Sequence, residues 1–281
     1  GQSANSTMNP SIVFLILFAI FRKGHPLSES SSTKHFVLVH GAGHGSWCWY
    51  KLAPILQNSG HNVTAIDLAA AGRDPRQPAD LHSFSDYTKP LTDFIASKAS
   101  EEKLILVGHS MGGLAISQAI EMFPQKISCA VFLAALMPGP RNNISAVMNR
   151  YFEQRPPLLD TISVYNETIG RTENFLGPNY LRTNLYQLSP VEDWTLATML
   201  VREVTVFNGE DMAKEVKLST KNYGSVRRVY VKTENDRAIG PNLQRWMIKR
   251  SPPNEVKVIN GCDHVPMMSA TKQLSSVLVD I

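Results

Sequence analysis

A serine in a short turn bounded by glycines is the first residue of this chain whose setting suggests chemistry. The mostly apolar residues 103–107 lead into Gly108-His-Ser-Met-Gly112, and a helix-compatible stretch follows at 114–123. A strand, a sharp turn and a helix are the context of the G-x-S-x-G nucleophile elbow, in which a strained turn exposes the serine hydroxyl. Small residues at 108 and 112 let the strand and the helix pass closely. We therefore interpret Ser110 as a nucleophile.

A serine nucleophile needs a base, and the base needs an acid that orients it. In chains with this elbow the acid follows the serine and the histidine comes last. His264 is the one histidine after Ser110, and it lies in a loop just after the last expected strand. Glu234 and Asp236 both follow the strand expected at 226–232. We favour Asp236, so the predicted triad is Ser110, Asp236 and His264.

The tetrahedral intermediate formed by such a serine carries an oxyanion that needs two backbone N–H donors. One donor is expected from the residue after the nucleophile, Met111, and the other from the loop after the first strand. In that loop we choose Ala42, because the glycines at 41 and 43 let the backbone approach a substrate. His40 and His109 are expected to be structural neighbours of the site.

The same glycine-rich loop permits a rival interpretation as a dinucleotide site. Gly41, Gly43 and Gly45 follow a strand and open a helix, and Asp67 ends the next strand. The G-x-G-x-x-G fingerprint, however, needs a glycine where this chain has Ser46. A nucleotide site would also leave the predicted triad unexplained, so we expect no cofactor.

The expected secondary structure alternates between strands and helices. The strands are expected at 35–40, 61–67, 103–107, 127–133, 226–232 and 255–259, and the helices at 49–58, 85–99, 114–123, 241–249 and from 270. Such alternation, with near-continuous apolar strands, predicts an α/β fold with a mostly parallel, doubly wound sheet. The alternation of strands and helices is interrupted at about 137–222, and we interpret this segment as a mainly helical insertion.

The composition narrows the classes of function. The chain has 281 residues, 43% of them hydrophobic, and a net charge of +4. No run of Lys and Arg exceeds two residues, which disfavours nucleic-acid binding. The three cysteines, at 48, 129 and 262, are too few and too scattered for a disulfide framework or a zinc site. We therefore expect neither a metal nor a nucleic-acid partner.

The segment before residue 34 is expected to be an N-terminal extension, residues 1–33. Residues 11–21 are almost wholly apolar, which is too short a run to span a bilayer alone but fits the core of a secretory signal. Against a signal, no basic segment precedes the run and no clear cleavage site follows it. The chain is thus expected in the cytoplasm if this run is not a signal, and in the secretory pathway if it is.

From about residue 34 to its end the sequence resembles the plant methylesterase and hydroxynitrile lyase family of α/β-hydrolases. The matching segments are HFVLVHGA (35–42), WCWYKL (47–52), GHNVTAIDL (60–68), GHSMGG (108–113), YGSV (223–226), QRW (244–246) and DH (263–264). The resemblance implies an α/β-hydrolase domain at 34–281 whose cap is the insertion at 137–222. It places triad and oxyanion donors on the residues already chosen, and it implies a homodimer.

Two chemistries occur in that family. The lyases place a threonine after the strand histidine and a lysine after the catalytic histidine, where this chain has Gly41 and Val265. Because neither residue has a hydroxyl or a cation, cyanide chemistry lacks its electrostatic support. We expect a serine carboxylesterase for small methyl esters of plant hormones or specialised metabolites, alkaloids included. The expected substrate contacts are Gly41, Ala42, Ser110 and Val265. A hydroxynitrile lyase and a non-catalytic hormone-binding protein remain the alternatives.

Overall fold

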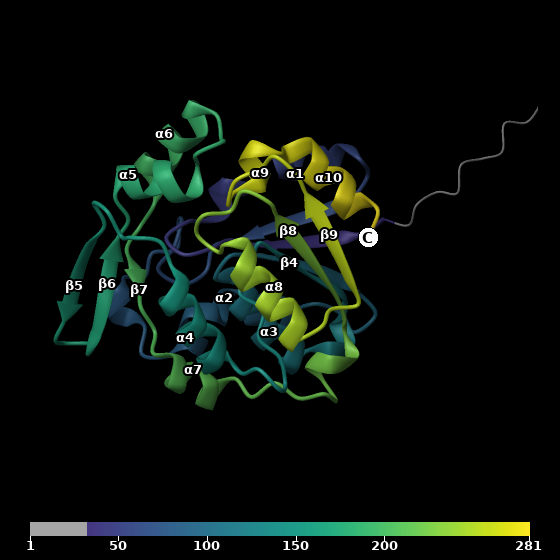
Figure 1. The fold of residues 1–281 in the computed structure, drawn as a ribbon. Helices are drawn as coiled ribbons and strands as arrows, with labels where there is room; N and C mark the ends of the chain where they lie inside the picture. The colour runs from purple at the N-terminus through teal and green to yellow at the C-terminus, as the bar shows by residue number, and fades with distance from the viewer. Residues whose placement is uncertain (1–32) are drawn as a thin grey trace, which may run out of the picture. The chain divides into compact units, whose positions relative to one another are not determined.

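A six-stranded parallel sheet is the centre of the computed structural model, which describes residues 33–281 (Figure 1). Its strands are β1 (His35–Val39), β2 (Asn62–Ile66), β3 (Leu104–His109), β4 (Ile127–Leu133), β8 (Arg227–Thr233) and β9 (Glu255–Ile259). They pair in the order β2-β1-β3-β4-β8-β9. The predicted extension lies outside the described residues, apart from Thr33.

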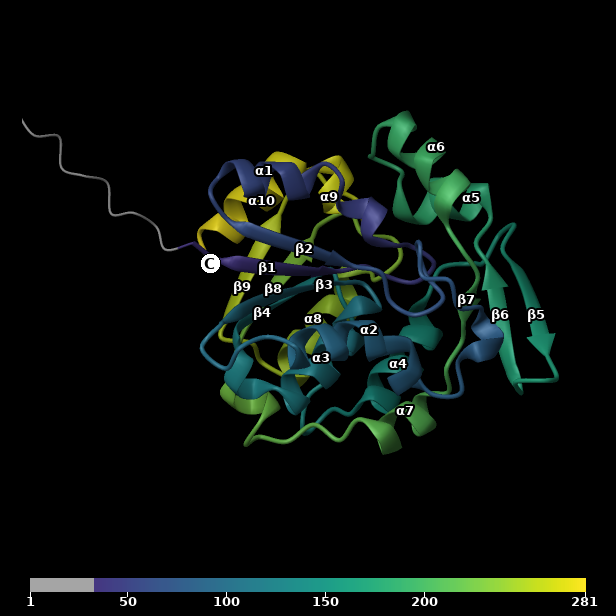
Figure 2. The same ribbon diagram turned by 180° about the vertical axis from the view of Figure 1, so that it is seen from behind.

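Helices cover both faces of this sheet (Figures 1 and 2). The helices of the main domain are α1 (Leu52–Asn58), α2 (Phe84–Ala96), α3 (Gly112–Met122), α8 (Pro241–Arg250), α9 (Pro266–Ser269) and α10 (Thr271–Val279). Alternate residues of each strand point to opposite faces, so Val37 packs in the core under α2, α3 and α8, and Leu38 in the core under α1 and α10. The predicted doubly wound α/β fold is confirmed.

Four short 3₁₀ helices complete the main domain. They are η1 (Ser46–Trp49), η2 (Pro78–Asp80), η3 (Pro124–Lys126) and η5 (Tyr223–Ser225). The helix expected at 49–58 is divided, because η1 precedes α1. The expected final helix is divided too, since α9 comes before α10. Pro90 lies inside α2, whose N-terminus is held by a capping box in which Ser83 accepts from the backbone N–H of Asp86 at 3.0 Å.

The insertion between β4 and β8 contains helices and a small second sheet. Its helices are α4 (Ile144–Gln154), α5 (Pro178–Tyr180), the π-helical turn η4 (Leu181–Leu185), α6 (Val191–Leu200) and α7 (Gly209–Glu215). Its antiparallel strands are β5 (Ile162–Asn166), β6 (Arg171–Phe175) and β7 (Val204–Thr205). Helices predominate, as predicted, but the sequence analysis missed the sheet. Every residue of β5 and β6 is exposed or half-buried, so no face imposes an apolar alternation.

The carboxyl ends of β1, β3, β8 and β9 meet at one edge of the sheet, because these strands run parallel. In open α/β sheets ligands bind at this edge, outside the ends of the strands. Each predicted site residue follows one of these four strands. Within residues 33–281 no helix combines the length and the apolar character needed to cross a membrane.

Candidate active site

Ser110 stands in a strained turn between β3 and α3. Its φ is 55°, a left-handed value that non-glycine residues rarely adopt. The Ser110 carbonyl accepts hydrogen bonds from the N–H groups of Gly113, at 3.1 Å, and Leu136, at 3.0 Å. A Cβ atom on Gly112 would lie 2.6 Å from the carbonyl oxygen of His40. The glycines are therefore required by the close approach of the backbones around the serine.

His264 and Asp236 form a buried hydrogen-bonded pair. His264 Nδ1 lies 2.8 Å from Asp236 Oδ2, and the two residues are 2% and 3% exposed. Asp236 Oδ1 accepts from the N–H groups of Ala238, at 2.9 Å, and Ile239, at 2.8 Å, while the Thr233 hydroxyl donates to Oδ2 at 2.9 Å. A carboxylate held beside Nδ1 favours the tautomer with its proton there, which leaves Nε2 as an acceptor.

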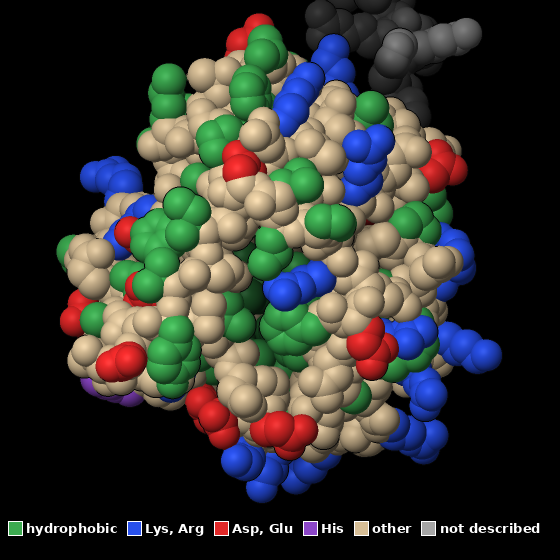
Figure 3. Space-filling view, turned by 60° about the vertical axis from the view of Figure 1, so that its left-hand side comes forward, with side chains coloured by type: hydrophobic (Ala, Val, Ile, Leu, Met, Phe, Trp, Pro, Cys, Tyr) green, Lys and Arg blue, Asp and Glu red, His purple; other side chains and the backbone are tan. Residues whose placement is uncertain are grey.

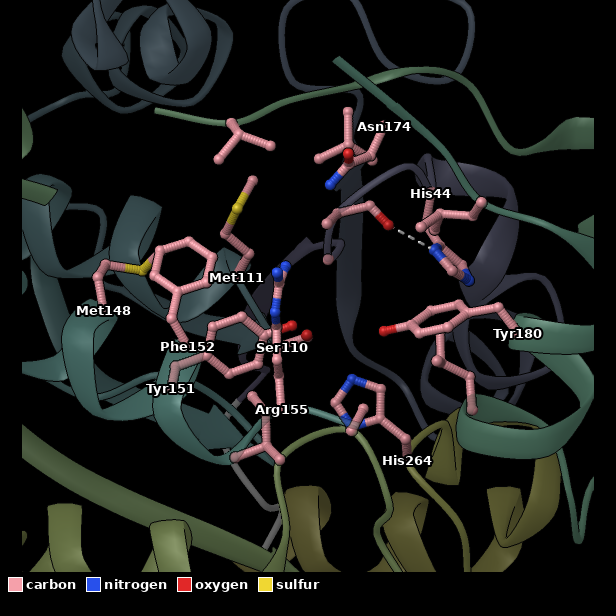
Figure 4. A pocket seen from close by; sticks show the side chains of 18 of the residues that line it. His44, Ser110, Met111, Met148, Tyr151, Phe152, Arg155, Asn174, Tyr180 and His264 are labelled. Carbon is pink, nitrogen blue, oxygen red and sulfur yellow. Dashed lines mark hydrogen bonds between the residues drawn. The ribbon is translucent and has the colours of Figure 1, made fainter. Parts of the chain in front are cut away.

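The predicted nucleophile and base share one cavity. Ser110 and His264 both line it, and Figure 4 shows the His264 ring among the side chains that surround it. Asp236 is not among the described lining residues, since it lies behind His264 and contacts its Nδ1. This arrangement gives the base one nitrogen for the acid and one for the cavity.

The predicted oxyanion donors border the same cavity. Ala42 and Met111 line it together with Gly41. A Cβ on Gly41 would lie 2.8 Å from Ser110 Cβ, so this loop packs directly against the serine. Met111 is the N-cap of α3, where backbone N–H groups and the helix dipole favour negative charge. Both N–H groups therefore come from segments that meet at Ser110.

His44 connects the oxyanion loop to the cap. Its Nδ1 lies 2.9 Å from the Ala42 carbonyl oxygen, and its Nε2 lies 2.6 Å from the Tyr186 hydroxyl. Burial lowers the pKa of His44 to about 4, so the ring is neutral at pH 7. A neutral ring that donates from Nδ1 to Ala42 accepts at Nε2 from Tyr186.

The next three cap residues bond to the loops of the acid and the base. Gln187 Nε2 donates to the Asn235 carbonyl at 2.7 Å. The Leu188 N–H and the Ser189 hydroxyl donate to Asp263 Oδ2 at 3.0 and 2.7 Å. Cap segment 186–189 is thus bonded to three of the four loops that carry the site, those after β1, β8 and β9. The sequence analysis missed it, although an acid directly before the base in the sequence, Asp263, was a signal.

Three other residues considered in the sequence analysis, Glu234, Asp67 and Val265, are not among the described residues that line the cavity. Glu234 is exposed, and the Asp67 carboxylate accepts from the Ser46 N–H at 2.6 Å, which ties the loops after β1 and β2 together. Val265 departs from its expected substrate contact. It is 1% exposed, packs in the core under α1 and α10, and is not among the described residues that line the cavity. Its side chain faces the core because its N–H is held by Asp263 at 3.0 Å.

Two further histidines, His40 and His109, are buried beside the site. His40 is fully buried, and its Nε2 accepts from the Leu68 N–H at 3.1 Å. His109 Nε2 donates to the His264 carbonyl at 2.7 Å. Burial holds the pKa of His109 well below its usual range, so it is neutral. The expectation that both are structural neighbours is confirmed.

The rest of the cavity wall comes mainly from the cap and is largely apolar. Figure 3 shows the hollow with hydrophobic side chains around it. The aliphatic, thioether and phenyl side chains of this wall are Met148, Phe152, Leu158, Leu176, Leu185, Val204, Val206, Phe207, Met212 and Ile239. The wall is therefore suited to an apolar ligand placed over Ser110.

Comparisons with known proteins agree with this geometry. The model of the alpha/beta hydrolase family matches residues 36–277. Methyl jasmonate esterase 1 of Vitis vinifera is 47% identical over 88% of this chain and 96% of its own length. Polyneuridine aldehyde esterase of Rauvolfia serpentina is 40% identical over 92% of this chain and 98% of its own.

Among solved structures, tomato Methylketone Synthase I complexed with 2-tridecanone has a TM-score of 0.84 and 49% identity, covering 88% of this chain and 97% of its own. Sequence, fold and site geometry lead to one assignment: the chain belongs to the α/β-hydrolase family, among the plant methylesterases and their relatives.

Proposed function

We propose that this protein is a serine carboxylesterase that hydrolyses small methyl esters. The observation that carries the proposal is the buried His264–Asp236 hydrogen bond beside a cavity that also contains Ser110. Two plant relatives, a methyl jasmonate esterase and a polyneuridine aldehyde esterase, support this reaction class.

In the first half of the reaction, the Ser110 hydroxyl attacks the ester carbonyl and His264 Nε2 takes its proton. Asp236 holds the ring and stabilises the imidazolium. The N–H groups of Ala42 and Met111 donate to the oxyanion, which is usually the largest single contribution to such catalysis. His264 then protonates the departing methanol oxygen, and the acyl group stays on Ser110.

In the second half, water attacks the acyl-serine while His264 takes a proton from it. The tetrahedral intermediate uses the same two N–H donors, and its collapse returns the proton to Ser110 and releases the carboxylic acid. The cycle needs only the ester and water. The apolar cap wall supports an acyl group such as that of a plant hormone or a specialised metabolite, alkaloids included.

The test is a panel of methyl esters of jasmonate, salicylate, indole-acetate and an alkaloid acid, assayed with wild type and Ser110→Ala. We expect turnover of at least one ester, and a fall of about a thousandfold or more in the variant because the nucleophile is lost. Methanol release that survives in Ser110→Ala would contradict the mechanism. Cyanide release from mandelonitrile would favour the lyase. Tight binding with no turnover, and no labelling of Ser110 by a fluorophosphonate, would favour a hormone-binding protein.

A second candidate substrate class is the methyl esters of β-keto acids. It is supported by the similarity to tomato Methylketone Synthase I, whose structures contain 2-tridecanone or β-ketoheptanoate. Hydrolysis would release R–CO–CH₂–COO⁻, which with one proton gives R–CO–CH₃ and CO₂. Methyl ketone formed from a β-keto ester by wild type, and not by Ser110→Ala, would support this class. Release of the intact β-keto acid alone would show that the protein stops at hydrolysis.

We also propose that the protein is a homodimer, on the family resemblance. Light scattering after size exclusion tests this, because the chain has a mass of 31.2 kDa. A particle of about twice that mass at micromolar concentration supports the dimer, and one of the chain's own mass contradicts it.

A further inference from the structure

One residue of the cavity wall does not fit an apolar acyl site. Among the described lining residues, Arg155 is the one with a permanent charge, and none is an Asp or a Glu. Arg150, on the same helix, is paired with Glu153 at 2.9 Å. The Arg155 guanidinium has no hydrogen bond or ion pair to any residue of 33–281. The cavity therefore carries a positive charge that the protein does not neutralise.

The position of Arg155 is set by the end of α4. It is the C-cap of that helix, its N–H donates to the Tyr151 carbonyl at 2.8 Å, and Pro156 and Pro157 prevent the helix from continuing. The guanidinium carbon lies 5.2 Å from the centre of the Phe152 ring, in cation–π range. In Figure 4 the side chain extends into the pocket beside Tyr151 and Phe152.

A helix C-terminus favours a cation, which explains the residue type but not this direction. A side chain whose sole task was to neutralise the helix dipole could extend into open solvent. Here the guanidinium lies against the aromatic wall of the cavity, with its N–H groups free to bind a ligand. Guanidinium groups bind carboxylates through two parallel hydrogen bonds.

We propose that Arg155 is an anion-binding subsite of this cavity, and that the preferred esters carry a free carboxylate on an apolar acyl chain. The ester carbonyl is placed at Ser110, the apolar chain lies along the cap wall, and the carboxylate binds Arg155. This inference rests on the proposed esterase function and names a substrate class for it. Because Arg155 is exposed, water and salt weaken the ion pair, so its effect is on selectivity.

The experiment compares two substrates of equal chain length: the monomethyl ester of a medium-chain dicarboxylic acid, and the methyl ester of the monocarboxylic acid. The measured quantity is the ratio of their kcat/KM values. In Arg155→Gln we expect the anionic-to-neutral ratio to fall about fivefold, the upper range for an exposed ion pair. Arg155→Lys should restore part of the ratio, and high salt should lower the wild-type ratio. Arg150→Gln is the matched control, because that residue is on the same helix but is not among the described lining residues.

An unchanged ratio in Arg155→Gln, or an equal change in Arg150→Gln, would overturn the inference. A binding measurement separates it from the proposed function. Ser110→Ala is titrated with octanoate and with octanamide, and Ser110→Ala/Arg155→Gln is titrated in parallel. The advantage of octanoate over octanamide should be larger in Ser110→Ala than in Ser110→Ala/Arg155→Gln, where only the Ala42 and Met111 N–H groups remain to attract a carboxylate. If no ester is turned over but this difference holds, the esterase proposal fails and the anion subsite stands. If esters are turned over and the octanoate advantage is equal in the two variants, the esterase proposal stands and the anion subsite fails.

Discussion

Three acidic residues, Glu234, Asp236 and Asp263, lie in the loops after β8 and β9. Their surroundings in the structure give them different roles. Asp236 is buried with five donors around its oxygens, including His264 Nδ1. Asp263 is buried too, but its oxygens are bonded to the cap and to its own loop. Glu234 is exposed. Residue type alone cannot separate these carboxylates, whereas their hydrogen-bond partners do.

We predict that Asp236→Asn lowers kcat by about three to four orders of magnitude with little change in KM. An amide cannot stabilise the imidazolium, and its NH₂ group facing Nδ1 favours the wrong tautomer of His264. Steady-state kinetics on whichever ester is turned over measures this. Glu234→Gln is the matched control, two residues away and exposed, and should retain wild-type kcat. A comparable loss in both variants would mean that the acid is not Asp236.

At the scale of elements, the site depends on loops from four strands and on one segment of the cap. The loops after β1, β8 and β9 each accept or share a hydrogen bond with cap segment 186–189. The cap therefore does more than cover the cavity. It holds the oxyanion loop through His44 and the loop of the base through Asp263.

We predict that Asp263→Asn lowers kcat and destabilises the protein by about 1–3 kcal/mol. An amide cannot accept at both former oxygens, so a buried donor among Leu188 N–H, the Ser189 hydroxyl and Val265 N–H loses its partner. Denaturant unfolding and hydrogen exchange of residues 186–189 measure this, beside the exposed control Asp211→Asn. Faster exchange at 186–189 with reduced kcat is expected. Wild-type exchange and stability would show that the segment does not depend on this carboxylate.

Across the whole molecule, buried neutral histidines around the site make stability depend on pH. Burial lowers the pKa of His44 to about 4 from its usual value of 6.5, and it lowers the pKa values of His40 and His109 as well. The unfolded chain therefore binds protons more readily than the folded chain between pH 6.5 and 4. The free energy of unfolding must fall as the pH is lowered through that window.

We predict that protonation of His44 alone lowers the free energy of unfolding by about 3 kcal/mol as the pH falls from 6.5 to 4. The measurement is urea unfolding at several pH values for wild type and His44→Gln. Glutamine retains a donor and an acceptor but cannot be protonated, so the variant's stability should fall less steeply on acidification. Parallel pH profiles in the two proteins would contradict the assignment of a lowered pKa to His44.

Much of the fold could be predicted because its signals are local. The strands at 127–133 and 255–259 were predicted with the observed bounds, since turn residues and short apolar or alternating runs delimit them. The cap sheet was missed because β5 and β6 are not deeply buried on either face, which removes the periodicity that sequence analysis uses. Val265 was expected at the substrate because the lyases of the family place a functional lysine at this position, directly after the catalytic histidine. Adjacent residues point in different directions, and its side chain faces the core.

The sequence by itself determined the parallel sheet and the predicted nucleophile and base. The elbow requires glycines at defined positions around Ser110, His264 is the one histidine that follows it, and buried strands must alternate with helices. Tertiary structure alone decided which cap residues hold the loops and that Arg155 reaches the cavity, and it showed that Asp236, favoured from the sequence, contacts His264. These contacts join residues far apart in the sequence, and side-chain direction and burial exist only after the chain has folded. A local pattern therefore identifies the groups able to react, whereas long-range packing decides what surrounds them.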